Sequence, residues 1–142
     1  KIAGTMADGT ATWMTGPKTI ETHVVPGITA AAREAGKPAP RIVVGLPIAV
    51  SEDVAAAREA AGKAFRMYGG LPNYKRMLDK EGAAGPADVA IVGNEAQVEQ
   101  QIRALASAGA TDFVAPIFPV GPDAAASLAR TRALLRSLIG RV

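Results

Sequence analysis

The residues best suited to bind a ligand lie together in one short segment, residues 13–19 (WMTGPKT). This segment contains the only tryptophan of the chain, a glycine that permits close backbone approach, and a lysine beside the expected start of a helix. A helix N-terminus attracts anions, and an indole ring packs well against another flat ring. Trp13, Thr15, Gly16 and Lys18 could therefore bind a ligand that has both an anionic group and a ring. The alternative is structural: Trp13 fills the core and Thr15 caps the helix.

No other residues form a convincing catalytic group. His23 is the only histidine, and a surface or packing role is favoured because no neighbouring side chain orients it as a base. Without cysteines or further histidines, no zinc site can be assembled. Ser51 and Ser127 lack a partner base, and the glycines form neither a phosphate-binding loop nor a dinucleotide fingerprint. The catalytic residues are unknown at this point, and we expect a bound cofactor to supply the chemistry.

The composition is that of a globular domain and excludes several classes of protein. Of the 142 residues, 49% are hydrophobic and 20% charged, which suffices for a core. No apolar run reaches the roughly 18–20 residues of a membrane span, and no signal peptide is recognisable, so we expect a cytoplasmic protein without a membrane partner. The net charge is only +3, and most basic residues alternate with acidic ones, which disfavours nucleic acid. Four late arginines are interpreted as a solvated helix face, with a phosphate-binding surface as the alternative: Arg130, Arg132, Arg136 and Arg141.

The elements that would position the binding segment alternate between strand and helix patterns. The predicted strands cover residues 10–14, 41–50 and 111–118, whereas residues 89–93 are apolar but too short to assign. The predicted helices cover residues 17–35 with a kink at Pro26, residues 52–68 after a Ser51 N-cap, residues 71–80, residues 94–109 with an Asn94–Gln97 capping box, and a last segment that ends at Leu138.

This alternation, with strands that are apolar on both faces, predicts an α/β fold with parallel strands. Residues 1–142 would be a single partial domain, with residues 69–88 as an excursion of loop and short helix. Three or four strands do not close a barrel, and bare sheet edges attract other chains. Residues 2–6 already show helical spacing, with Gly9 as the expected left-handed residue after the helix. We therefore expect a fragment that needs a missing N-terminal half or a partner.

Two long segments and the closing arginine-rich helix resemble one protein family. Residues 2–50 and 85–118 are similar to the C-terminal half of luciferase-like oxidoreductases, most of all to the actinobacterial branch that uses a deazaflavin coenzyme. The motifs that carry the resemblance are Ala3-Gly4, Ala7-Asp8-Gly9 and the strand–Gly-Pro–helix that follows. The resemblance covers essentially the whole chain, but these motifs distinguish deazaflavin users from FMN users less well.

The resemblance implies the C-terminal part of a (β/α)8 TIM barrel, whose typical length is about 250 residues. Residues 10–14, 41–50 and 111–118 would be the last three barrel strands. In the family the cofactor lies at the C-terminal mouth of the barrel, and much of its phosphate cradle precedes the position of Lys1. Trp13, Thr15, Gly16 and Lys18 match the loop that borders the cofactor in relatives.

On this basis the full protein would transfer a hydride between reduced coenzyme F420, a deazaflavin, and a small organic substrate. One alternative is a flavin monooxygenase that uses FMN and oxygen. A second is a non-catalytic half-barrel module that forms a homodimer through its open edges. We expect the isolated chain to be inactive, because the phosphate cradle and the first half of the barrel are absent.

Overall fold

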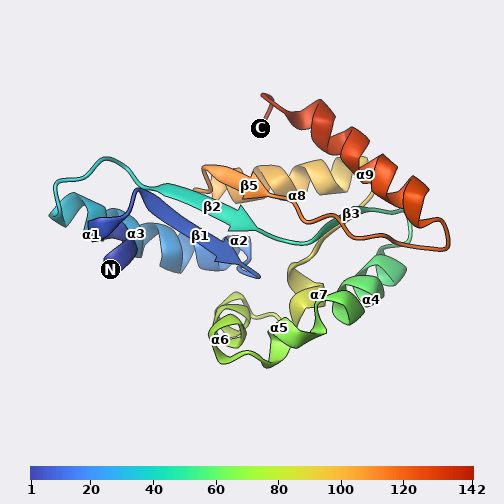
Figure 1. Ribbon diagram of the computed structural model, residues 1–142, viewed down its shortest axis with the longest axis horizontal. Coiled ribbons are helices and arrows are strands. Elements are labelled where there is room, and N and C mark those ends of the chain that lie inside the picture. The colour runs from blue at the N-terminus through green and yellow to red at the C-terminus, as the bar shows by residue number, and fades with distance from the viewer.

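The computed structural model describes residues 1–142 and contains five short strands, all in parallel pairs (Figure 1). One sheet has the order β1-β2-β5, and a second sheet pairs β3 with β4. The strand bounds are β1 Gly9–Trp13, β2 Arg41–Gly45, β3 Ile48–Val50, β4 Ile91–Gly93 and β5 Asp112–Val114. The parallel α/β prediction is thus confirmed, and the unassigned segment 89–93 contributes β4.

The long strand predicted over residues 41–50 is interrupted, because Pro47 has no N–H to donate to a neighbouring strand. The chain nevertheless keeps its direction across the break. Leu46 N–H donates to the Val114 carbonyl at 3.4 Å, and Ile91 N–H donates to the Pro47 carbonyl at 2.8 Å. An isolated parallel bridge also joins Ile48 to Ile117. The two sheets are therefore joined end to end through residues 46–48, which connect β2 to β3.

The first helices form one continuous helical segment over residues 17–34, preceded by the short helix α1 (Ile2–Met6). This segment consists of α2 (Pro17–Thr19), the π-helical turn η1 (Ile20–Val24) and α3 (Val25–Glu34). The expected disturbance at Pro26 takes the form of that π turn, since proline lacks the N–H that an α-helix would use there.

Gly9 does not end α1 in the left-handed conformation, so that expectation is wrong. It is the first residue of β1, and its φ is not in the left-handed region. A Cβ atom at this position would lie 2.1 Å from the Arg41 carbonyl oxygen. Glycine is therefore required by the close approach of β1 and β2, not by a helix end.

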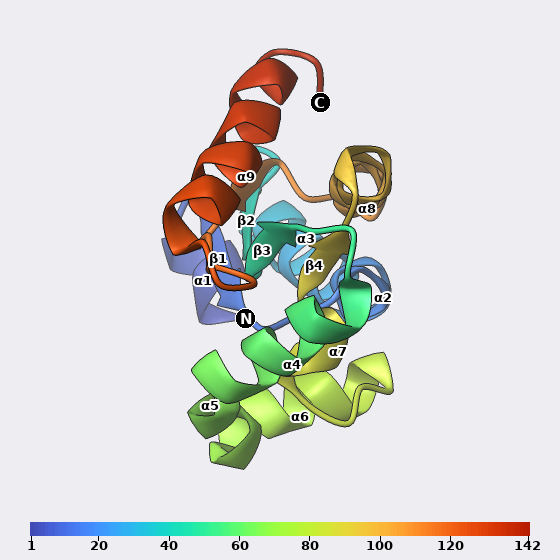
Figure 2. The same cartoon turned by 90° about the vertical axis from the view of Figure 1, so that its right-hand side faces the viewer.

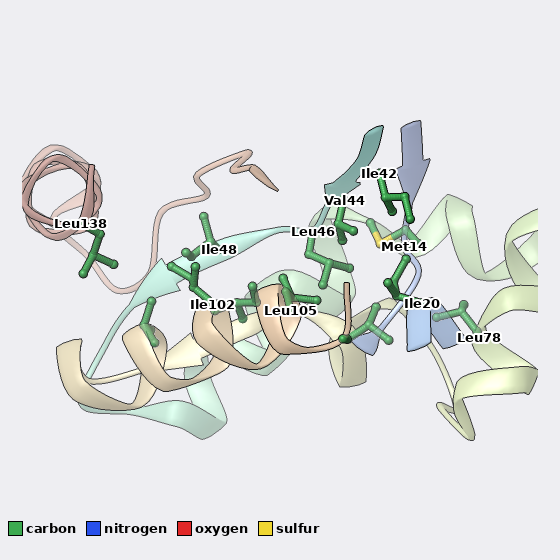
Figure 3. Close-up of a cluster of buried hydrophobic side chains, with 14 of the residues drawn as sticks. Met14, Ile20, Ile42, Val44, Leu46, Ile48, Leu78, Ile102, Leu105 and Leu138 are labelled. Carbon is green, nitrogen blue, oxygen red and sulfur yellow. The ribbon is translucent and has the colours of Figure 1, made fainter. Parts of the chain in front are cut away.

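One face of the strands is covered by helices and holds the main core. Ile42 and Val44 are buried on this face together with Met14 and Ile20. Farther along, β3 packs on α8 (Glu95–Ser107), and Figure 3 shows Ile102 and Leu105 pointing from α8 toward Leu46 and Ile48. Helix α8 begins with the predicted capping box, in which Asn94 and Gln97 exchange side-chain to backbone hydrogen bonds of 3.1 and 3.0 Å.

Residues 54–89 form four helices near the carboxyl ends of β1 and β3 (Figure 1, green to yellow). This segment contains the excursion predicted over residues 69–88, and from here on the name excursion refers to all of residues 54–89. They are α4 (Val54–Ala64), α5 (Arg66–Gly70), α6 (Pro72–Glu81) and α7 (Pro86–Val89). Asp53, and not Ser51 as expected, caps α4, because its carboxylate accepts the Ala56 N–H at 2.9 Å. The Ser51 hydroxyl instead contacts the backbone of Asp53.

The last helix, α9 (Ala124–Leu138), packs on β3, and Figure 2 shows α9 and α8 on either side of that strand. The hydroxyl of Thr131 is fully buried at this contact. It accepts the Val50 N–H at 2.9 Å and donates to the Ser127 carbonyl at 3.2 Å. A side chain from the middle of α9 thereby accepts a hydrogen bond from the N–H of the last residue of β3.

The interpretation of the late arginines as one solvated face needs a correction at Arg130. Its guanidinium makes ion pairs with Glu95, at the start of α8, and with Glu52, after β3. The two acids are far from Arg130 in sequence, so local charge counting missed them.

No helix of the structure has both the length and the apolar character that crossing a membrane requires.

Candidate cofactor site at the carboxyl ends of the strands

The face of the sheet that α3 and α8 leave uncovered carries Trp13 at its carboxyl end. In the strand register Trp13 pairs with Gly45, and Gly45 pairs with Val114. Because side chains alternate along a strand, these three residues lie on the face opposite to buried Val44. Val114 is 52% exposed. In a closed (β/α)8 barrel this face points to the interior, and ligands bind at the carboxyl ends of its strands.

Trp13 lies directly over Gly45. A Cβ atom on Gly45 would approach Trp13 Cε3 to 2.9 Å, which leaves no room for a side chain beneath the indole. The next residue, Met14, has φ of +55°, a left-handed conformation that is rare outside glycine. This turn directs the chain from β1 into the helical segment, and the buried Met14 side chain anchors it in the core.

Five of the six aromatic residues of the chain form one cluster around Trp13. The excursion contributes Phe65 and Tyr68, whose ring centroids lie 6.0 and 5.6 Å from the indole in edge-on geometry. Tyr74 continues the series, 5.1 Å from Tyr68, and Phe118, beyond β5, lies 5.8 Å from Phe65. Edge-on contacts of this kind stabilise aromatic pairs, so the excursion is held against the strand ends.

The indole N–H of Trp13 has no hydrogen-bond acceptor although its nitrogen is buried. Tryptophan N–H groups that are removed from water nearly always have a partner, and an unpaired one costs about 1–3 kcal/mol. A flat ligand that brings a carbonyl oxygen or ring nitrogen to this face would satisfy the donor. The residues present therefore fit a ring of the flavin or deazaflavin type, given a small shift of the covering side chains.

The other residues of the binding segment are arranged differently from what either interpretation expected. Thr15 is buried, and its hydroxyl donates to the Trp13 carbonyl at 3.2 Å instead of capping the helix. Gly16 is the N-cap residue and is buried, whereas Lys18 is exposed. The N–H groups at the helix start are bonded to the carboxylate of Glu81, from the end of α6. The anion at this N-terminus thus comes from the chain itself, and no local pattern pointed to Glu81.

Two groups of ion pairs lie at opposite ends of the strands. At the carboxyl end, hydrogen bonds from Arg130 and from its own backbone lower the pKa of Glu95 to about 2. At the amino end, hydrogen bonds from Arg41 and Thr111 lower the pKa of Asp112. All of these groups bind one another, so they stabilise the fold and offer no free acid or base. The structure contains no cluster of three or more metal-ligating side chains, and His23 is exposed on the π turn.

Comparisons with known proteins identify the family and the fold of the chain. The profile of the luciferase-like monooxygenase family matches residues 1–123. Among solved structures, the coenzyme F420-dependent tetrahydromethanopterin reductase of Methanopyrus kandleri is similar with a TM-score of 0.65 and 22% identity, over 89% of this chain and 44% of that one. A monooxygenase of Streptomyces bottropensis is similar with a TM-score of 0.66 and 17% identity, over 98% of this chain and 43% of that one.

An F420-dependent secondary alcohol dehydrogenase, in complex with an F420-acetone adduct, gives a TM-score of 0.63 and 18% identity, over 96% of this chain and 44% of that one. A search of curated proteins found no match. The chain spans less than half the length of these solved structures, which confirms the expected partial barrel. The chain belongs to the luciferase-like monooxygenase family and forms part of that family's α/β barrel.

Proposed function

We propose that this chain is the C-terminal part of an oxidoreductase in which reduced coenzyme F420 and a small organic substrate exchange a hydride. The observation that carries the proposal is the buried, unpaired Trp13 N–H at the carboxyl ends of the strands, on the face opposite to α3 and α8. Two of the similar solved structures are named as F420-dependent enzymes, which supports a deazaflavin as the cofactor.

When bound, the cofactor would supply the hydride chemistry, and the protein would bind and orient the reactants. Trp13 would contact the cofactor ring and donate its indole N–H. Phe65 and Tyr68 of the excursion would exclude water from the reacting atoms, which strengthens polar interactions inside the site. Gly45 would keep the indole flat against the sheet, because a larger residue would displace it.

The remaining residues of the binding segment would shape the border of the cofactor site. Thr15 fixes the backbone turn through its hydrogen bond to the Trp13 carbonyl, and Gly16 leaves room for the Glu81 carboxylate beside that turn. Lys18 is exposed beside this turn, so its ammonium group would pair with an anionic part of the cofactor. Its backbone N–H is already used by Glu81.

An FMN-dependent monooxygenase is the second candidate, supported by the likeness to the Streptomyces monooxygenase. The two candidates differ in the molecule that the full-length protein binds. Absorbance and mass spectrometry of the small molecule released on denaturation decide between them. Release of a deazaflavin supports the proposal, whereas release of FMN supports the alternative and overturns the hydride-transfer assignment.

The sheet edges bear on the partner that completes the barrel. β1 and β5 are the outer strands of their sheet, and an apolar groove of about 470 Å³ lies between α8, β5 and α9. Ile139 and Val142, which line this groove, are 80% and 47% exposed. Such surfaces favour pairing with the first half of a barrel, and a homodimer is the alternative. The solution mass of the isolated chain separates them, since a uniform dimer favours self-pairing.

A further inference from the structure

The carboxylate of Glu81 joins the excursion to the helical segment that begins at Pro17. Its Oε2 accepts the Thr19 N–H at 2.7 Å, and its Oε1 accepts the Lys18 N–H at 3.2 Å. The first N–H groups of a helix have no partner within the helix, and its N-terminus favours negative charge. Glu81 therefore caps this helix, although it lies more than 60 residues later in the sequence.

Gly16 and Glu81 are sterically matched. Gly16 is the N-cap, where a serine, threonine, aspartate or asparagine is usual, and it provides no side-chain cap. Its φ of −78° suits any residue, so backbone freedom does not explain the glycine. The explanation is space: a Cβ atom on Gly16 would lie 2.4 Å from Cδ of Glu81. The glycine makes room for a cap that comes from the excursion.

Apolar and backbone contacts hold Glu81 in this position. It is the last residue of α6, which ends at Gly82 with φ of +83° and with a hydrogen bond from Ala83 N–H to the Leu78 carbonyl at 2.9 Å. Leu78 is buried in the main core, one turn before Glu81. Helix α6 is thus fixed at two points, by the polar contact of Glu81 and by the apolar contact of Leu78.

We propose that Glu81 is a positioning residue: its capping of the Pro17 helix sets where the aromatic rings of the excursion lie against Trp13. The same helix carries Tyr74, which contacts Tyr68, and Tyr68 contacts the indole. Release of Glu81 would free α6 to move and with it this wall of rings. The effect on catalysis rests on the proposed function, but the coupling to Trp13 does not.

The test uses the 142-residue chain without a cofactor, so its failure is distinguishable from failure of the proposed function. Trp13 is the only tryptophan, and its emission and its quenching by acrylamide report whether the rings still cover it. Hydrogen exchange of the Thr19 amide reports the cap itself. Loss of an N-cap costs about 1 kcal/mol, so Glu81→Ala should speed this exchange roughly fivefold.

Glu81→Ala should also shift the Trp13 emission to longer wavelength and raise acrylamide quenching, with helix content by circular dichroism almost unchanged. Glu81→Gln, which keeps an acceptor oxygen but loses the charge, should give a smaller change in the same direction. Asp79→Asn is the matched control, because Asp79 is exposed on the same helix and pairs only with Lys75.

Gly16→Ala provides an independent test that leaves the charge in place. The added methyl group should expel the carboxylate and reproduce the Trp13 changes of Glu81→Ala, and the double variant should show no further change. The proposal is overturned if Glu81→Ala and Gly16→Ala both speed amide exchange but leave Trp13 emission and quenching at wild-type values. Glu81 would then be a local cap only. Unchanged exchange in both variants would overturn it as well.

Discussion

Replacement of Thr131 by valine tests the contact that joins the last helix to the sheet. The Thr131 hydroxyl accepts the Val50 N–H at 2.9 Å and donates to the Ser127 carbonyl, and the residue is fully buried. Valine has nearly the same shape but no hydroxyl. The substitution therefore leaves the Val50 N–H buried without an acceptor, while the packing around the side chain is preserved.

A buried donor without a partner costs about 1–3 kcal/mol. We expect Thr131→Val to lower the free energy of unfolding by about 2 kcal/mol, within that range. Urea unfolding followed by circular dichroism measures the change, provided that the m-value is the same for both proteins. Thr131→Ser keeps the hydroxyl and loses one methyl group, so it should cost only about 1 kcal/mol.

Thr22→Val is the matched control, because the Thr22 hydroxyl donates to the Lys18 carbonyl on an exposed surface. It should change stability by less than about 0.5 kcal/mol. If Thr131→Val is as stable as the control, the Val50 N–H has another partner and the docking of α9 on β3 is not as described.

Three further predictions concern the site and its surroundings. Gly45→Val should displace the Trp13 ring, cost about 1–3 kcal/mol of stability by overpacking, and shift the Trp13 emission; unchanged emission would contradict the assigned contact. The folded-state pKa of Glu95 lies below its ordinary value of 4.5, at about 2, so its ion pair stabilises the fold above pH 4.5 and this contribution is lost as the pH falls toward 2. Arg130→Met should therefore be less stable than the wild type at neutral pH. As the pH falls from 4.5 to 2, its free energy of unfolding should decline less steeply than that of the wild type, and equal declines would refute the ion pair as the cause. Titration of the isolated chain with coenzyme F420, followed by Trp13 fluorescence, should show weak or no binding, whereas micromolar affinity would contradict the need for the missing half.

Local sequence patterns predicted the elements whose signals lie within a few residues. The capping box of Asn94 and Gln97, the buried face of α8, and the parallel strands all follow from short-range spacing or composition. Pro47 is an instructive exception. Its missing N–H was visible in the sequence, but the apolar run around it favoured a single uninterrupted strand, and the structure divides that strand in two.

The features that sequence reasoning missed depend on contacts between distant segments. Glu81 caps a helix that starts more than 60 residues earlier, and Arg130 pairs with acids from two other elements. Gly16 looked like a position for ligand approach, but the space beside it is filled by Glu81. Trp13 and Thr15 lie in the binding segment that the sequence indicated. The aromatic cluster around Trp13 could not be predicted, because it depends on how the excursion folds back onto the strand ends. The spacing of residues along the chain does not reveal contacts between segments that are distant in sequence.

We propose that the carboxyl ends of these strands form part of a cofactor site. The most direct measurement is a structure of the full-length protein with coenzyme F420 bound. We expect the deazaflavin ring to lie at the strand ends, with an acceptor atom in hydrogen-bond reach of the Trp13 indole N–H, at about 3 Å. A ring bound elsewhere, with Trp13 covered by protein alone as in the isolated chain, would contradict it.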